Sequence, residues 1–237
     1  MPQFFSISGP LLENIDGLLL AIFQGKDDKR TISEIMGGLQ RIVRGEFKSP
    51  HNGEWLDDVC IDFYLALLQR RQENPLYKGL QCYFFSTFFY AGLVNNKKYS
   101  FQAVASWTNV LKTSLFNLDR LIFPINLVNK HWACVVAYIA KRKLEYLDSM
   151  GLDGEIVMLH IARYLDDHAR DQKLKVMDAF KWERTSNKKI PMQEDGFNCG
   201  VFTCAYSDYR SLGLEIDFLP SDIHSFRKKV AQEILIG

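Results

Sequence analysis

Residues 193–202 read Gln-Glu-Asp-Gly-Phe-Asn-Cys-Gly-Val-Phe, and this stretch decides how the chain is interpreted. Cys199 follows a turn that Gly196 permits, and it begins a predicted helix. A helix N-terminus favours negative charge through its dipole and its N–H groups, and Gly200 leaves room beside the sulfur. A lone cysteine is most often a small core residue, as we expect for Cys204, but this setting predicts a nucleophile at Cys199.

Three other residues are candidate partners for a cysteine nucleophile. His131 begins a predicted strand and could act as a general base, and Asp148, on the next predicted strand, could hold one nitrogen of its ring. Counting from the hairpin turn between these strands places the two side chains roughly across from each other. The amide of Gln193 and the backbone N–H of Cys199 could hold an oxyanion. The structural alternatives are a strand-end cap for Asp148 and a solvated loop for Gln193. Together the four residues are the parts of a cysteine hydrolase.

Composition narrows the class of protein. The chain has 237 residues, a net charge of +1 and 47% apolar residues, which fits a globular protein without a nucleic-acid footprint. Its five cysteines form no CxxC pair, so we expect neither a disulfide framework nor a zinc site, and we expect a reducing compartment. The apolar run over residues 18–23 is too short to span a bilayer.

Hydrophobic periodicity predicts most of the secondary structure. The predicted strands cover residues 120–127, 131–139, 143–149 and 173–180. A buried helix or loop is expected at residues 79–94. A helix is expected at residues 10–23, and a second one begins at a capping box over residues 31–34 and extends to residue 43. Further helices are expected at residues 54–72, 100–116, 153–170, 199–210 and 221–236. Helices, then a mostly antiparallel sheet, then helices indicate an α+β fold. The turn-rich residues 48–53 predict a boundary between a helical extension, residues 1–50, and a main domain, residues 51–237.

The motifs, taken in order, resemble those of the Ulp/sentrin-specific cysteine proteases, which process and remove SUMO and related ubiquitin-like modifiers. The matching segments cover about residues 50 to 237. They are Trp55-Leu56-Asp57-Asp58, Ser106-Trp107-Thr108, Phe123-Pro124-Ile125-Asn126, His131-Trp132, Tyr146-Leu147-Asp148-Ser149, residues 193–202 and the terminal helix over residues 222–235.

This resemblance implies a papain-like α+β fold of the Ulp/adenain type, with a central sheet flanked by helices. It implies cleavage after a diglycine C-terminus. His131, Asp148 and Cys199 would form the triad, and Gln193 would complete the oxyanion hole. No metal or organic cofactor is implied.

The resemblance also implies how the substrate binds. Trp55 and Trp132 would form a narrow tunnel that admits Gly-Gly and rejects side chains, although each could instead be a core residue. Asp58 would meet a basic residue of the modifier. For Trp107, core and interface roles are equally open.

The chain departs from the family pattern at two places. Asn198 stands where the family usually has Asp before the nucleophile, and Asp195 stands where the family often has Asn. Ser106 and Asn109 replace basic residues beside the family's tryptophan, which bears on the choice of modifier.

The sequence therefore predicts a SUMO-directed cysteine isopeptidase or processing protease. It would be monomeric and intracellular, in the nucleus or the cytoplasm, and would have no nucleic-acid or membrane partner. The nearest alternative is a deneddylase or deubiquitinase of the same fold, including a bacterial effector that acts in a host cell. An acetyltransferase and a non-catalytic module that binds ubiquitin-like modifiers are further alternatives. The extension over residues 1–50 is expected to bind substrate or target, or to cover a hydrophobic patch.

Overall fold

A computed structural model describes residues 11–35, 40–47, 53–128, 130–174 and 178–236. The chain forms two compact units. The helical unit contains Met1–Gly79 and Pro191–Gly237, and the sheet unit contains Leu80–Ile190. Among the described residues, no helix is both long and apolar enough to cross a membrane.

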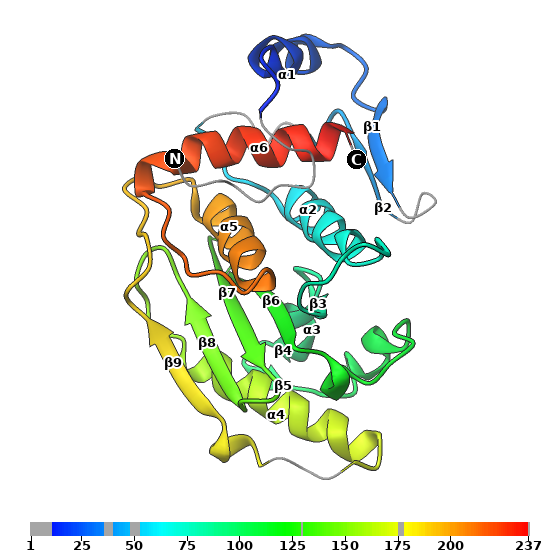
Figure 1. The fold of residues 1–237 in the computed structure, drawn as a ribbon, viewed down its shortest axis with the longest axis vertical. Coiled ribbons are helices and arrows are strands. Elements are labelled where there is room, and N and C mark those ends of the chain that lie inside the picture. Colours follow the sequence, from blue (N-terminus) through cyan, green and yellow to red (C-terminus); the bar gives the residue numbers. More distant parts are fainter. Residues whose placement is uncertain (1–10, 36–39, 48–52, 129, 175–177, 237) are drawn as a thin grey trace. The chain divides into compact units, whose positions relative to one another are not determined.

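The sheet unit is built on a five-stranded sheet in the order β3-β6-β7-β8-β9 (Figure 1). The three central strands pair antiparallel and confirm the sequence prediction; they are β6 (Arg120–Leu127), β7 (His131–Tyr138) and β8 (Lys143–Leu147). The outer strands β3 (Cys82–Phe84) and β9 (Glu183–Asn187) join them in parallel. Because β7 and β8 are antiparallel neighbours, the start of β7 and the end of β8 lie at the same end of the sheet.

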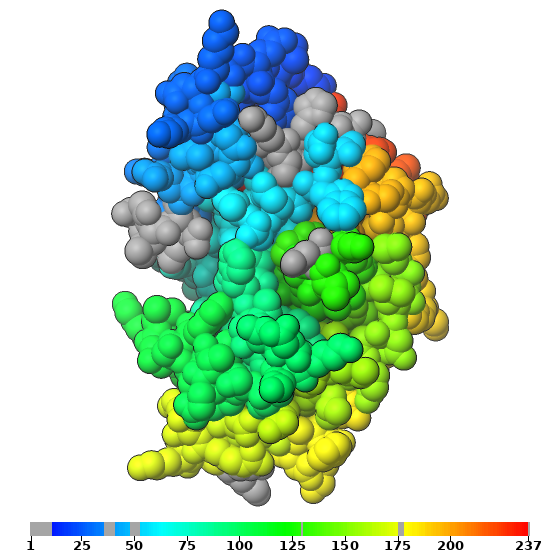
Figure 2. All heavy atoms as spheres, turned by 180° about the vertical axis from the view of Figure 1, so that it is seen from behind, coloured from blue at the N-terminus to red at the C-terminus, as the bar shows by residue number. Residues whose placement is uncertain are grey.

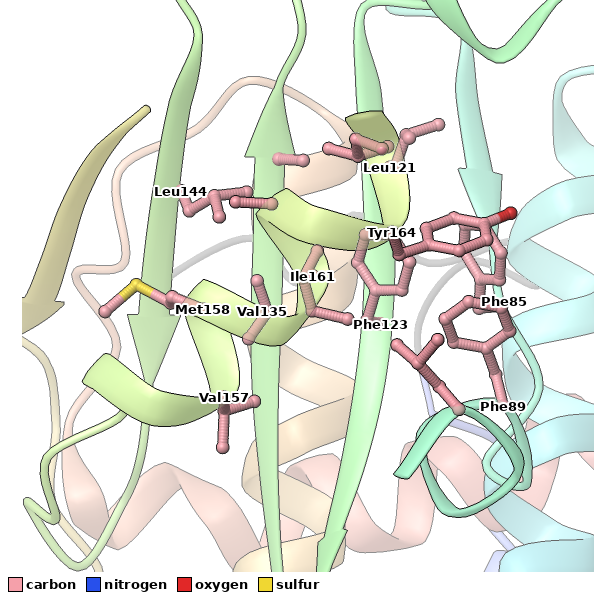
Figure 3. Packing of buried hydrophobic residues seen from close by; sticks show 14 of the residues in the cluster. Phe85, Phe89, Leu121, Phe123, Val135, Leu144, Val157, Met158, Ile161 and Tyr164 are labelled. Atoms are coloured by element: carbon pink, nitrogen blue, oxygen red, sulfur yellow. The ribbon is translucent and has the colours of Figure 1, made fainter. Parts of the chain in front are cut away.

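Helix α4 (Glu155–Asp171) was predicted and lies across one face of this sheet (Figure 3). Its apolar stripe includes Val157, Met158 and Ile161, which are buried in the core of the unit. Tyr164 extends the stripe to an aromatic group, where the ring of Phe85 stacks on that of Phe123 at 4.2 Å. The short helix α3 (Phe89–Leu93) adds a further ring to this group.

Two predictions within the sheet unit are wrong, and the stretch at residues 79–94, expected to be a buried helix or loop, also contains the strand β3. In place of a helix over residues 100–116, the chain forms two short 3₁₀ helices, η2 (Ala105–Thr108) and η3 (Leu115–Asn117), after the two-residue strands β4 (Val94–Asn95) and β5 (Lys98–Tyr99). The apolar residues Phe101, Val104 and Leu115 are buried in the core of this unit. However, the Ser114 hydroxyl accepts a bond from the Phe116 N–H, an alternative to helical hydrogen bonding.

The strand predicted at residues 173–180 is the second error, because the edge strand is the polar β9 farther along the chain. Residues 175–177 lie outside the described residues. The segment after them forms the 3₁₀ helix η4 (Ala179–Lys181), with the Asp178 carboxylate accepting from the Phe180 N–H. The buried carboxylate of Asp166, on α4, accepts from the Ala179 N–H. These long-range and capping bonds outweigh a weak local strand signal.

In the helical unit, three helices pack against one another and were all predicted. They are α2 (Asp58–Arg71), α5 (Cys199–Ser211) and α6 (Ile223–Ile236), and the 3₁₀ helix η5 (Pro220–Asp222) precedes the last of them. The rings of Tyr64 and Phe226 meet edge-on at 6.3 Å between α2 and α6. The Arg71 guanidinium pairs with the buried Asp208 carboxylate at 2.6 Å between α2 and α5.

The N-terminal extension is only partly helical, which corrects the prediction for residues 1–50. Helix α1 (Ile15–Gln24) is confirmed, but the capping-box signal at residue 31 opens an antiparallel pair, β1 (Thr31–Ile35) and β2 (Gln40–Val43). The isoleucine, threonine and valine content of this stretch favours strand. Figure 2 shows α1 and the strand pair as one continuous blue surface. The predicted boundary lies mostly outside the described residues, which omit 48–52.

Candidate active site

The sheet unit carries the predicted acid–base pair. The register aligns Cys134 with Leu147, so residue 148 lies opposite residue 133. Residues 133 and 131 share a face of the sheet, and Asp148 is therefore on the same face as His131 and diagonal to it. The Nε2 atom of His131 lies 3.0 Å from Oδ1 of Asp148. The predicted contact between these two side chains is therefore confirmed.

Asp148 is buried and held by two further donors. The Tyr146 hydroxyl donates to Oδ2 at 2.9 Å, and the Met150 N–H donates to Oδ1 at 2.7 Å. Burial alone would raise the pKa of Asp148, but the bonds from His131, Met150 and Tyr146 outweigh it and lower that pKa. Asp148 is therefore a carboxylate at neutral pH and can orient the imidazole.

Tyr146, which the sequence analysis placed in a motif without a role, is one of the donors that hold Asp148. Burial and the charge of Asp148 raise the pKa of its phenol, so it stays protonated and remains a donor. A Cβ on Gly154 would lie 2.1 Å from the Tyr146 ring, so the glycine leaves the space that this ring fills. The sequence did hold a signal for this contact. Tyr146 lies two residues before Asp148, and alternate residues of a strand share a face.

The two tryptophans of the sheet unit that were predicted to contact substrate, Trp107 and Trp132, have different surroundings. Trp132 pairs with Asn126 across β6 and β7 and, as the next residue of the strand, points to the face opposite His131. Trp107 lies in η2 and is half-buried, and its ring meets Phe89 edge-on at 5.9 Å. Trp107 therefore contributes to the core of the sheet unit, and its contact with a modifier stays a prediction.

The helical unit carries the predicted nucleophile. Cys199 is the first residue of α5, and the Asn198 carbonyl accepts from the Phe202 N–H at 2.9 Å in the first turn. A Cβ on Gly200 would lie 2.9 Å from Cβ of Leu56, so the glycine lets α5 approach the segment that carries Trp55. By contrast, Gly196 lacks the positive φ that would require glycine, and a Cβ there meets nothing within 4 Å. The turn at Gly196 therefore does not depend on glycine, which corrects the sequence argument.

Trp55 is joined directly to the turn before the nucleophile. Its indole Nε1 donates to the Gly196 carbonyl at 2.9 Å, while 51% of its surface stays exposed. An exposed indole that is fixed by a hydrogen bond can present a rigid flat wall. Asp58 is the first residue of α2, beside Asp57, whose carboxylate caps that helix by accepting from the Cys60 N–H at 2.9 Å.

Gln193 lies in the same turn. Its Nε2 donates to the Asp195 carbonyl at 2.7 Å, which fixes the side-chain amide against the turn that leads to Cys199. Arg227, on α6, is a second residue that the sequence interpretation left without a role. Its Nε donates to Oδ1 of Asn198 at 3.0 Å and its Nη2 to the Glu54 carbonyl at 2.8 Å. Only tertiary structure shows this, because Arg227 is remote from the turn in sequence.

The predicted site residues are thus divided between the units. The helical unit holds Cys199 and Gln193 together with two predicted substrate contacts, Trp55 and Asp58. The sheet unit holds His131, Asp148, Trp132 and Trp107.

A family model described as the Ulp1 protease family, C-terminal catalytic domain, matches residues 54–236. The chain belongs to the Ulp1 protease family. The chain is similar to ubiquitin-like-specific protease 1A of Arabidopsis thaliana, 36% identical over 77% of this chain, and to sentrin-specific protease 2 of Homo sapiens, 38% identical over 82%. The chain spans 37% and 32% of the lengths of these two relatives.

Solved structures from the Ulp1 family confirm the predicted α+β, Ulp-type fold. The chain is similar to the C-terminal Ulp1 protease domain that was solved in complex with Smt3, the yeast orthologue of SUMO; the TM-score is 0.81 and the identity 23%, with 98% of each chain covered. The catalytic domain of the Chaetomium thermophilum Ulp1-like SUMO protease matches with a TM-score of 0.78 and 23% identity, covering 100% of this chain and 94% of that one.

Proposed function

We propose that this chain is a cysteine protease and isopeptidase that cleaves after the C-terminal Gly-Gly of SUMO, in both processing and deconjugation. The observation that carries the proposal is the bond between His131 and a carboxylate pinned by two further donors, in a chain of the Ulp1 family. The names of its relatives, ubiquitin-like-specific and sentrin-specific proteases, support the choice of modifier.

In this proposal Cys199 is the nucleophile. Its Sγ attacks the carbonyl carbon of the terminal glycine, and His131 takes the thiol proton. Because Asp148 accepts from Nε2–H, the imidazole is held in the tautomer whose Nδ1 is the basic atom. The tetrahedral intermediate collapses to a thioester as the leaving amine takes the proton back from His131. Water then attacks the thioester with His131 again as base, releasing the glycine carboxylate and the thiol.

The developing oxyanion would be held by groups of the helical unit. The backbone N–H of Cys199, at the first position of α5, and the side-chain amide of Gln193 are the proposed donors. The bond from Gln193 to the Asp195 carbonyl supports a fixed orientation of that amide.

Substrate selection would depend on aromatic residues and one carboxylate. Trp55 and Trp132 are proposed to line a passage too narrow for a Cβ, which selects glycine. Asp58 would pair with a basic residue of the modifier, and Trp107 would contact the modifier surface. Residues 1–50 are proposed as an extension, beside the protease domain at 51–237, that binds substrate or target.

We propose that the protein acts as a monomer in a reducing intracellular compartment, which is the nucleus, the cytoplasm or both. All five cysteines lie among the described residues, and none of them is joined in a disulfide there, which supports this compartment.

The decisive experiment compares SUMO, NEDD8 and ubiquitin carrying C-terminal electrophiles. We expect a covalent adduct at Cys199 with SUMO, mapped by peptide mass spectrometry, and no adduct with the Cys199→Ala variant. An adduct with NEDD8 or ubiquitin alone would show that the proposed modifier is wrong and that the cysteine protease mechanism is right. Labelling of the protein by acetyl-CoA alone would point to an acetyltransferase.

A further inference from the structure

The turn before Cys199 is held by a chain of polar side chains. Oδ1 of Asp195 accepts from the N–H groups of Phe197 and Asn198, both at 2.9 Å. Its Oδ2 accepts from Nδ2 of Asn198 at 2.6 Å, and Oδ1 of Asn198 accepts from Nε of Arg227 at 3.0 Å. Asn198 and Arg227 are buried, so solvent is a poor substitute for these partners.

The direction of each hydrogen bond in this series of side chains is determined by the groups at its two ends. Backbone N–H groups and a guanidinium are donors only. Between them stand two side chains, at positions 195 and 198, and each contact needs one donor and one acceptor. Asp195 with Asn198 satisfies every contact, because the amide turns its oxygen to Arg227 and its nitrogen to the carboxylate.

Only one other pairing of carboxylate and amide satisfies the same contacts. With Asn at 195 and Asp at 198, the Asn oxygen accepts from the backbone and its nitrogen donates to the new carboxylate, which also accepts from Arg227. Two amides leave two NH2 groups facing each other, and two carboxylates face each other with no proton between them. The departure of this chain from the family pattern is therefore an exchange that preserves every hydrogen bond.

Arg227 also reaches a second segment. Its Nη2 donates to the Glu54 carbonyl at 2.8 Å and to the Phe197 carbonyl at 3.4 Å. The residue after Glu54 is Trp55, whose indole is bonded to the Gly196 carbonyl. One buried guanidinium thus joins the turn before the nucleophile to the segment that carries the exposed indole.

The guanidinium has the charge and geometry for this task. Burial lowers the pKa of Arg227 to about 10, against an opposing effect of the Asp195 charge, so the group is cationic at neutral pH. Its rigid, branched donor set reaches three acceptors from one plane, which the single ammonium of a lysine cannot reproduce.

We propose that Arg227 is a positioning residue for the reaction at Cys199, acting through positions 195 and 198, which must hold one carboxylate and one amide in either order. The proposal rests on Cys199 being the nucleophile of the proposed function. It explains how the turn that presents the sulfur and the backbone N–H of Cys199 is kept in one shape.

The test is a double-mutant cycle of Asp195→Asn, Asn198→Asp and the combined variant, with Arg227→Lys as a fourth protein. Turnover of a SUMO C-terminal fluorogenic amide gives kcat and KM, and iodoacetamide alkylation of the Cys199 peptide gives a rate that needs no modifier. Lys228→Ala, next along α6 with a partly exposed ammonium, is the matched control, because it loses only a surface ion pair to Asp16.

We expect each single variant and Arg227→Lys to lower kcat by about 10- to 100-fold with little change in KM, the order that misplacing a reacting group produces. We expect the combined variant to regain activity to within about threefold of the starting protein, since all its hydrogen bonds are restored. The rates of Cys199 alkylation should fall and recover in the same order.

A combined variant as impaired as the product of the two single effects, or one that fails to fold, would overturn the proposal. Activity equal to that of the starting protein in all four variants would also overturn the proposal. If the starting protein is inert toward every SUMO substrate, the proposed function fails, while the alkylation series still decides between recovery and no recovery.

Discussion

The two units hold their reactive groups by different physical means. In the sheet unit, the pairing of β7 and β8 places His131 and Asp148 side by side, and a backbone ladder maintains that geometry. In the helical unit, Cys199 follows a turn whose shape depends on polar side chains and a buried guanidinium. Substitutions in the sheet unit should therefore change protonation, whereas substitutions in the turn should change geometry.

The largest effect is expected from removing the nucleophile. Cys199→Ser should lower turnover by more than about 10⁴-fold, because a serine hydroxyl is a far weaker nucleophile than a thiolate. The affinity for SUMO, measured by calorimetry, should stay unchanged, since the substitution alters one atom. Lost affinity together with an unchanged melting temperature would show that the sulfur serves binding, contrary to the proposed mechanism.

Asp148→Asn should have the next largest effect and should act through protonation. An amide nitrogen donates to Nε2 of His131, which forces the proton onto Nδ1 and removes the base; turnover should fall by about 10³- to 10⁴-fold. Circular dichroism should show an intact fold, because the strand pairing does not involve this side chain. Near-normal turnover would mean that the carboxylate does not set the tautomer.

Tyr146→Phe gives a smaller effect that depends on pH. The folded-state pKa of Asp148 lies below the ordinary aspartate value of 3.8, so this carboxylate contributes stability that is present above about pH 4 and lost as the pH falls through the folded pKa. Removing the hydroxyl raises that folded pKa and should cost about 1–2 kcal/mol of unfolding free energy at pH 7. The difference between the two proteins should shrink in acid.

Urea unfolding between pH 3 and pH 7 measures this difference. Tyr138→Phe is the matched control, because it removes a hydroxyl that donates to Glu145 at 2.5 Å and does not contact Asp148. Turnover at pH 7 should fall several-fold in Tyr146→Phe and not in Tyr138→Phe. Equal turnover in the two variants would remove Tyr146 from the support of the acid–base pair.

The smallest effects are expected from two glycines that flank the nucleophile turn. Gly200→Ala brings a Cβ to 2.9 Å from Leu56 Cβ and 3.2 Å from its carbonyl oxygen, and should cost about 1–2 kcal/mol after the gain in helix propensity. Gly196→Ala meets open space and should change the unfolding free energy by less than about 0.5 kcal/mol. Thermal unfolding of both variants measures these two costs. A larger loss of stability in Gly196→Ala than in Gly200→Ala would show that glycine is required at 196 rather than at 200.

The sequence by itself determined the parts whose signals are local. Long amphipathic periods predicted α2, α4, α5 and α6, and hairpin spacing predicted β7 and β8 and the contact of His131 with Asp148. The motif order predicted the family to which the chain belongs. Local signals failed where tertiary bonds compete with them: at the strand pair β1–β2, at the 3₁₀ helices η2 and η3, and at the edge strand β9.

Only the tertiary structure decided how the reactive groups are supported. The bond from Arg227 to Asn198, the indole of Trp55 on the Gly196 carbonyl and the ring of Tyr146 beside Gly154 each join residues that no local pattern connects. Hydrogen bonds of this kind follow from how the elements pack, and a buried donor selects its acceptor by proximity rather than by distance along the chain. Periodicity encodes which face of an element is buried, and packing alone determines which polar groups meet there.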